Sequence, residues 1–130
     1  MSLNIEIKPD ERIIIGETLI TNDGHRARLT IEGNTPILRK KDIMLVEEAD
    51  TPCKKTYLII QLMYLSQTPR EQHELYFQMI GDILKAAPST APLIDAINNH
   101  LLSGAYYKAL KQAKALIEYE KELLENEESC

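Results

Sequence analysis

The stretch DTPCKKTYLIIQLMYL, residues 50–65, decides how the chain divides. Thr51 or Asp50 can cap a helix N-terminus, and Pro52 suits the first helical position. The residues that follow are apolar on almost every side of a helix, which is typical of an element buried from most directions. We therefore expect the helix Cys53–Ser66 to be the most buried element of the protein.

The residues before this stretch have the period of strands. LNIEIK (3–8) and HRARLTIE (25–32) alternate apolar with polar residues, as half-buried strands do. RIIIGETLIT (12–21) is rich in β-formers and ends at Asn-Asp-Gly, which predicts a hairpin to the next strand. A turn at EGNTP then leads to a short strand at ILR (37–39). These segments predict a small antiparallel sheet within about residues 3–45, with one face buried.

The residues after the opening stretch have the period of helices. TPRE (68–71) has the spacing of a capping box and predicts a second helix, which Pro88 ends. A third is expected over about Thr90–Ser103 with Gly104 as its C-terminal cap, and a fourth from about Ala105. The prediction is an α+β fold in a single domain, 1–130, with the small sheet covered by about four helices. Within it we expect a β-rich part (1–46), a helical part (47–118) and an acidic, frayed C-terminal end (119–130).

Charge and cysteine content narrow the class of protein. The chain of 130 residues has 15 basic and 20 acidic residues, and the segment 118–128 alone accounts for the net charge of −5. This balance argues against a general nucleic-acid binder, which normally has surplus cations. Two distant cysteines, Cys53 and Cys130, suggest a reducing compartment. Charges within the first 20 residues argue against a signal peptide, and no apolar run approaches the roughly 20 residues of a membrane span. We expect a soluble, cytoplasmic protein without a membrane partner.

The sequence has little that points to catalysis. The glycines are too far apart for a phosphate-binding loop, no serine has a nucleophile-elbow context, and the histidines and cysteines lack metal-ligand spacing. We expect a protein that is not an enzyme, with no catalytic residues, no metal site and no cofactor.

The basic residues of the strand half are more informative. Alternation along residues 25–32 turns Arg26 and Arg28 to solvent, and we expect the turn at residues 33–36 to return the chain beside that strand. The expected RNA-contacting set is Arg26, Arg28, Arg39, Lys40 and Lys41, with Lys8 and Arg12 as possible extensions. No aromatic residue precedes Tyr57, so no aromatic stacking platform lies on this sheet. Two alternatives remain: these cations pair with acidic residues across the sheet, or the basic face is instead Lys108, Lys111 and Lys114 of the last helix.

Several segments together resemble the flagellar biosynthesis repressor FlbT family. They are LNIEIKPDERIIIGETLI, LRKKDIM, EADTPCKKTYLIIQLMYL and SGAYYKALKQAKALIEYE, and their order is that of the family. Where the family commonly has Gly in the first turn, this chain has Asp10. The resemblance implies a post-transcriptional regulator of flagellin synthesis that associates with the 5′ untranslated region of flagellin mRNA, represses translation and promotes decay.

The first 45 residues are also similar to the carbon storage regulator, a β-rich protein that binds mRNA leaders. That resemblance points by position to Arg39 as an RNA contact. The rival hypothesis is a protein adaptor that docks a flagellar regulatory partner through its helical half. In either case we expect a homo-oligomer, because the helix at residues 53–66 is apolar on more sides than this small chain can easily cover.

Overall fold

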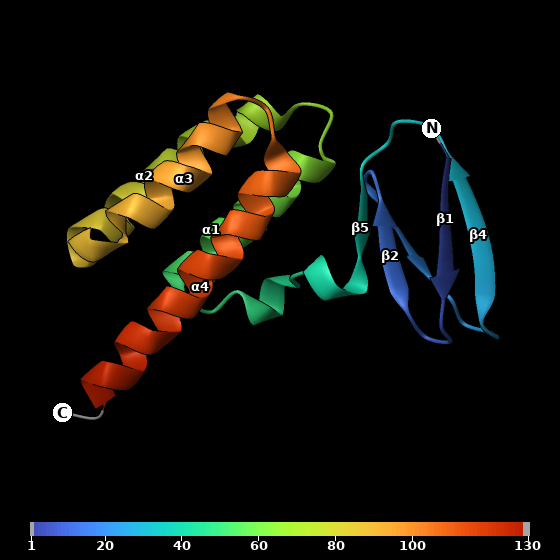
Figure 1. Cartoon of the computed structure of the whole chain (residues 1–130), viewed down its shortest axis with the longest axis horizontal. Helices are drawn as coiled ribbons and strands as arrows, with labels where there is room; N and C mark the ends of the chain where they lie inside the picture. Colours follow the sequence, from blue (N-terminus) through green and yellow to red (C-terminus); the bar gives the residue numbers. More distant parts are fainter. Residues whose placement is uncertain (1, 129–130) are drawn as a thin grey trace. The chain divides into compact units, whose positions relative to one another are not determined.

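The computed structural model describes residues 2–128, which form two compact units with their boundary between Ile43 and Met44. Strands make up the first unit and helices the second (Figure 1). This confirms the predicted α+β class.

The strand unit contains two small antiparallel sheets. One pairs β1 with β4, and the other has the order β3–β2–β5. The strand bounds are β1 Ser2–Ile7, β2 Arg12–Ile15, β3 Thr18–Thr21, β4 Ala27–Glu32 and β5 Ile37–Arg39. A 3₁₀ turn, η1, follows at Lys40–Asp42.

The predicted hairpin at residues 22–24 is wrong. The stretch 12–21 is two strands, β2 and β3, whose register pairs Ile15 with Thr18 and leaves Gly16 and Glu17 as a two-residue turn. Gly16 has a φ of +62°, and a Cβ there would lie 3.0 Å from Thr35 Cγ2, so this turn needs glycine. The following strand, β4, pairs instead with β1.

Apolar side chains from both sheets form one cluster. Ile5 and Ile7 of β1 and Ile13 of β2 are buried at its centre, and half-buried residues of β2, β4 and β5 pack against them. Each sheet therefore covers the inner face of the other. This gives the strand unit a core of its own, which two isolated ribbons of this size would lack.

The helical unit contains four α-helices, and α4 packs against both α1 and α3. Their bounds are α1 Pro52–Leu65, α2 His73–Ala86, α3 Ala91–Leu102 and α4 Tyr106–Glu128. The predicted start of the second helix is wrong: Thr68 makes no side-chain cap, and residues 69–72 form a 3₁₀ turn before α2. Gly104 has a φ of +77° and ends α3 as predicted. No helix in the described part of the chain is long and apolar enough to cross a membrane.

Helix α1 has the deepest burial, as its composition predicted. Eight of its residues are buried, against three each in α2 and α3. Ile59 and Met63 are buried and Leu58 is half-buried, whereas Leu62 is 48% exposed. The polar interruption at Gln61 is satisfied, because its amide accepts a hydrogen bond from Met44 N (2.7 Å) and donates one to Met44 O (3.0 Å).

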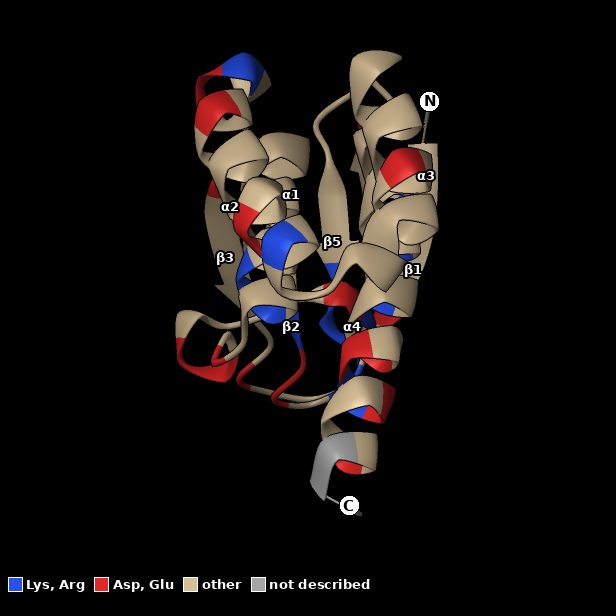
Figure 2. Ribbon diagram, turned by 90° about the vertical axis from the view of Figure 1, so that its left-hand side faces the viewer, with Lys and Arg blue, Asp and Glu red and all other residues tan. Residues whose placement is uncertain are grey.

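A carboxylate from α4 completes the N-terminus of α1. Thr51 caps the helix by accepting a hydrogen bond from Lys54 N at 3.2 Å. Glu120 accepts from the Thr51 hydroxyl and, at 3.1 Å, from Cys53 N. A negative charge at a helix N-terminus is favourable because unpaired N–H groups point toward it. Helix α4 extends to Glu128, and Figure 2 shows acidic positions in its last turns. Through Glu120, at least one carboxylate of this acidic segment stabilises the fold. The rest of the predicted frayed end, residues 129–130, lies outside the described residues.

Replacing Glu120 with Ala should lower the free energy of unfolding by about 1–2 kcal/mol, because two donors at the α1 N-terminus lose their acceptor. Urea titration followed by circular dichroism measures the change. Glu118→Ala, at an exposed position of the same helix, is the matched control and should have the parent midpoint. Equal midpoints for the two variants would contradict the capping role.

The thiol of Cys53 should make stability depend on alkaline pH. Burial, followed by the charge of Glu120, raises the pKa of Cys53 from 9.0 to about 12. Above about pH 9 the unfolded chain therefore releases a proton that the folded chain retains. The unfolded state then binds fewer protons, so stability falls as pH rises from about 9 toward 12. The fall in urea midpoint between pH 8 and pH 9.5 should be smaller for Cys53→Ala than for the parent chain; an unchanged fall would refute this.

Candidate nucleic-acid interface

The predicted arginines of β4 lie on its outward face. Arg28 is exposed, and its Cα partner on β1 is Glu6. Arg26, just before β4, places its Nη1 3.5 Å from the Glu6 carboxylate. The expected alternation along residues 25–32 is confirmed. The alternative, in which these cations pair with acidic residues across the sheet, is seen at Arg26. Glu6 is therefore the residue around which these two arginines lie.

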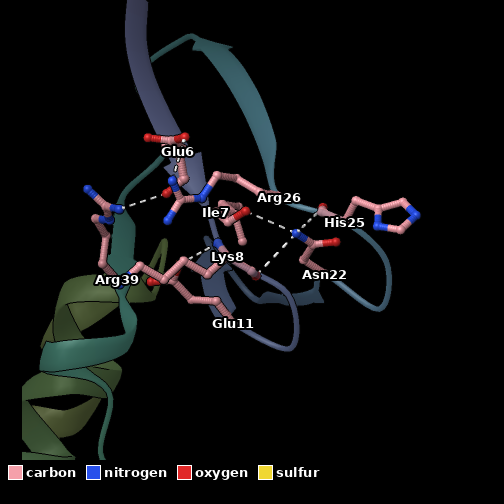
Figure 3. Close-up of polar contacts among 8 residues, drawn as sticks. All are labelled: Glu6, Ile7, Lys8, Glu11, Asn22, His25, Arg26 and Arg39. Carbon is pink, nitrogen blue, oxygen red and sulfur yellow. Dashed lines mark hydrogen bonds and ion pairs between the residues drawn. The ribbon is translucent and has the colours of Figure 1, made fainter.

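Arg39 also contacts Glu6, but the strand that positions it is not the one predicted. The prediction that the turn at residues 33–36 returns the chain beside β4 is wrong, because β5 pairs with β2. Arg39 is opposite Ile13, whose side chain faces the apolar cluster between the sheets. At the end of its strand Arg39 extends across to β1, where its Nη2 donates to the Glu6 carbonyl at 3.2 Å (Figure 3). One residue of β1 thus holds Arg26 by its side chain and Arg39 by its backbone.

Lys40 and Lys41 extend this group of cations along the chain. Both are exposed in the turn η1, and together with Glu11 and Arg39 they line an open surface hollow of about 530 Å³. Such a hollow is large enough for a phosphate group with part of its sugar. Its one acidic side chain, Glu11, accepts a hydrogen bond from Lys8 N at 2.9 Å.

A second hollow, of about 400 Å³, lies on the outward face of the β1–β4 sheet. Its polar lining is Asn4 and Glu6 from β1 with Arg28 and Thr30 from β4. The hydroxyl of Thr30 donates to Asn4 Oδ1 at 2.9 Å. This face offers amide, hydroxyl, carboxylate and guanidinium groups, which are the groups that hydrogen-bond to base edges.

The two possible extensions of the site differ. Lys8 lies at the end of β1, beside Glu11, and its side chain is exposed. Arg12 is also exposed, but neighbouring residues of a strand point to opposite faces, so it leaves β2 on the face away from Ile13. The structure brings Arg26 and Arg39 together at Glu6, whose Cα partner is Arg28, whereas Arg12 lies on the opposite face of β2 from Ile13 and Arg39.

Asn22 connects two loops near these cations through its side-chain amide. From the sequence it was expected only to form part of a turn. Its Nδ2 lies within hydrogen-bond distance of three carbonyls, those of Ile7 (3.0 Å), Lys8 (3.1 Å) and His25 (2.9 Å) (Figure 3). Its Oδ1 accepts a hydrogen bond from Gly24 N. These contacts join the end of β1 to the loop that leads to Arg26. The Asn-Asp-Gly sequence was a signal for local backbone capping by the Asn side chain.

Replacing Asn22 with Ala should loosen the end of the β1–β4 sheet, with a loss of about 1–2 kcal/mol because several carbonyls lose their donor. Hydrogen exchange measures this directly: amides of residues 5–8 and 26–29 should exchange faster than in the parent chain. Asn34→Ala, at an exposed position of another turn, should leave those rates unchanged. Equal protection in both variants would show that Asn22 is not the organising residue.

The alternative basic face lies on α4. Lys108 and Lys111 are exposed and Lys114 is half-buried. The Lys111 ammonium lies 5.1 Å from the centroid of the Tyr107 ring, which itself lies 5.4 Å from the ring of Tyr64. This face therefore combines cations with a partly exposed aromatic residue, a combination that the sheet face lacks.

Charge is evenly balanced in the strand unit as a whole. Residues 1–43 contain seven basic and seven acidic side chains, so the cations around Glu6 and η1 are a local concentration rather than part of a basic unit. Within the described residues 2–128, no group of three His, Cys, Asp or Glu side chains is placed to hold a metal ion. Fold and surface define a small α+β protein with a localised group of cations on its strand unit.

Sequence comparison identifies the family: the chain belongs to the family described as "Flagellar protein FlbT", which it matches over residues 3–124. The "Probable flagellum biosynthesis repressor protein FlbT 1" of Bradyrhizobium diazoefficiens is 53% identical over 124 residues, covering 95% of this chain and 85% of that protein. The corresponding protein of Rhodopseudomonas palustris is 46% identical, with 95% and 98% covered. The "Flagellum biosynthesis repressor protein FlbT" of Caulobacter vibrioides is 31% identical, with 95% and 90% covered. No solved structure matches the chain.

Proposed function

We propose that this chain represses flagellum biosynthesis after transcription, by associating with the 5′ untranslated region of flagellin mRNA in the cytoplasm. Binding there limits translation and favours decay of the message. Family membership and the names of the relatives support the repressor role. The observation that supports RNA contact is the meeting of Arg26 and Arg39 at Glu6, next to the hollow lined by Lys40 and Lys41.

The RNA backbone would lie along Arg39, Lys40 and Lys41. These three exposed cations follow one another at the end of β5 and in η1. They can therefore neutralise successive phosphates, and the RNA then releases the counterions bound to those phosphates. This contact does not require a basic protein, because counterion release depends on the local concentration of charge.

Bases would lie against the outward face of β1 and β4. Guanidinium planes such as that of Arg28 can stack on unpaired bases in the absence of aromatic residues. Glu6 limits the strength of this interaction, because its carboxylate already pairs with Arg26 and repels phosphate. The expected binding is therefore selective for single-stranded leader segments rather than strong for any nucleic acid.

The rival function, a protein adaptor for a flagellar regulatory partner, is favoured by one observation on the helical unit. Large apolar side chains stay exposed there, among them Leu62, Leu75 and Phe77 at 43–48% exposure. The affinity of a partner for such an apolar surface would change little with salt concentration, whereas with phosphate contacts the log of the affinity falls linearly with the log of the salt concentration.

Replacing Arg39 and Lys41 together with Ala should weaken binding to a flagellin leader RNA about tenfold and reduce the salt slope by about 1.4, the value for two phosphate contacts on a single strand. Fluorescence anisotropy with the purified chain at several salt concentrations measures both quantities. A thermal melt separates lost binding from lost folding, because Arg39 also contributes one hydrogen bond to β1.

The matched control replaces Lys108, Lys111 and Lys114 with Ala. This variant should bind leader RNA as the parent does. The opposite result, with loss in the α4 variant alone, would place the RNA site on the helical unit. A parent chain that does not bind leader RNA at any salt concentration would leave the adaptor function as the better account.

A further inference from the structure

Strand β4 has an edge without a partner strand in the described part of the chain. Its six residues pair on one side with β1, and the sheet that they form has only these two strands. Along the other side, backbone N–H and C=O groups are available to another strand. Such an edge is a template for strand addition unless it is shortened, charged with lysine, interrupted by proline or bulged.

The charged side chains of β4, Arg28 and Glu32, have opposite signs and so do not exclude a second copy of the strand. The strand has no proline and no lysine, and its register with β1 continues without a bulge from Ala27 to Glu32. The other edges are less suitable. β3 has four residues and β5 three, and on β1 the Glu6 carbonyl already accepts a hydrogen bond from Arg39.

We propose that β4 pairs antiparallel with β4 of a second copy of this chain, with Thr30 opposite Thr30 on a two-fold axis. In antiparallel pairs, directly opposite residues share a face of the sheet. This register places Arg28 opposite Glu32 of the second copy, and Glu32 opposite Arg28, so two charge pairs form on the outward face. On the inward face, Leu29 lies opposite Ile31 twice. The strand is therefore complementary to itself in both charge and apolar character, as a two-fold interface requires.

The neighbouring register is less favourable. With Leu29 on the axis, Arg28 would face Thr30, and Glu32 would depend on Arg26. Arg26 lies before the start of β4 and already pairs with Glu6 at 3.5 Å. The Thr30 register uses only residues of β4 for its charge pairs.

Pairing would convert each two-stranded sheet into half of a four-stranded one. Leu29 and Ile31 are half-buried in the single chain, and Leu3, the Cα partner of Ile31 on β1, is 45% exposed. A neighbouring strand gives Leu29 and Ile31 further apolar contacts, and a wider sheet is more stable than a ribbon. Arg28 also belongs to the proposed RNA face, but Arg39, Lys40 and Lys41 lie on the other sheet and in η1, and the dimer is measured without RNA, so this inference does not depend on RNA binding.

Charge reversal on the full chain tests both the partner and the register. Sedimentation equilibrium in reductant, across micromolar concentrations, should show a dimer for the parent. Glu32→Arg and Arg28→Glu should each raise the dissociation constant about tenfold or more, because each variant turns two attractive pairs into repulsive ones. An equimolar mixture should dimerise again, since each variant then supplies the charge that the other needs.

Glu17→Arg is the matched control. It makes the same change of charge at an exposed position of the β2–β3 turn and should stay dimeric. Arg28→Glu also faces Glu6 within one chain; if circular dichroism shows that it does not fold, Glu32→Arg alone carries the test. A monomeric parent, single variants that dimerise like the parent, or a mixture of folded variants that stays monomeric would each overturn the proposal.

Discussion

The burial of α1 is the constraint on which the helical unit depends. A helix that is apolar on nearly every side cannot be stable at a surface, so other elements must surround it. The long helix α4 packs along it, α2 packs beside it, and the segment at Met44 is fixed to it through Gln61. Burial also excludes water from part of the N-terminus of α1, so its donors need acceptors within the protein. Glu120 of α4 supplies one for Thr51 and Cys53, although it lies in an acidic segment whose composition does not distinguish it.

The strand unit is organised differently, by backbone contacts rather than by one dominant apolar element. Two small sheets share a few isoleucines, and Asn22 joins the loops at one end. Asp10 has a φ of +65°, a left-handed conformation that costs a non-glycine residue about 1–2 kcal/mol. Aspartate is one of the few residues other than glycine that adopt this conformation, so the loop between β1 and β2 can form without glycine.

The proposed RNA contact would connect function to the fold through Glu6. Its backbone and carboxylate hold two arginines from separate parts of the chain, on a unit whose charges otherwise cancel. A site of this kind does not attract nucleic acid at long range, as a basic protein would. It presents cations in a fixed arrangement instead, which under the proposed function would favour a particular leader over RNA in general. The same outward face contains the charges through which two β4 strands would align.

The sequence by itself determined the α+β class, the buried α1 and the outward orientation of Arg28 on β4, because all of these follow from local periodicity. It also determined the family, through segments in a particular order. Which strands pair with one another was decided only by the tertiary structure. Asn-Asp-Gly signals a turn, but whether the flanking strands pair depends on distant partners, and here β3 pairs with β2 and β4 pairs with β1. The meeting of Arg39 with Glu6, 33 residues apart, and the capping of α1 by Glu120 depend on how elements pack, and no local pattern of residues contains that information.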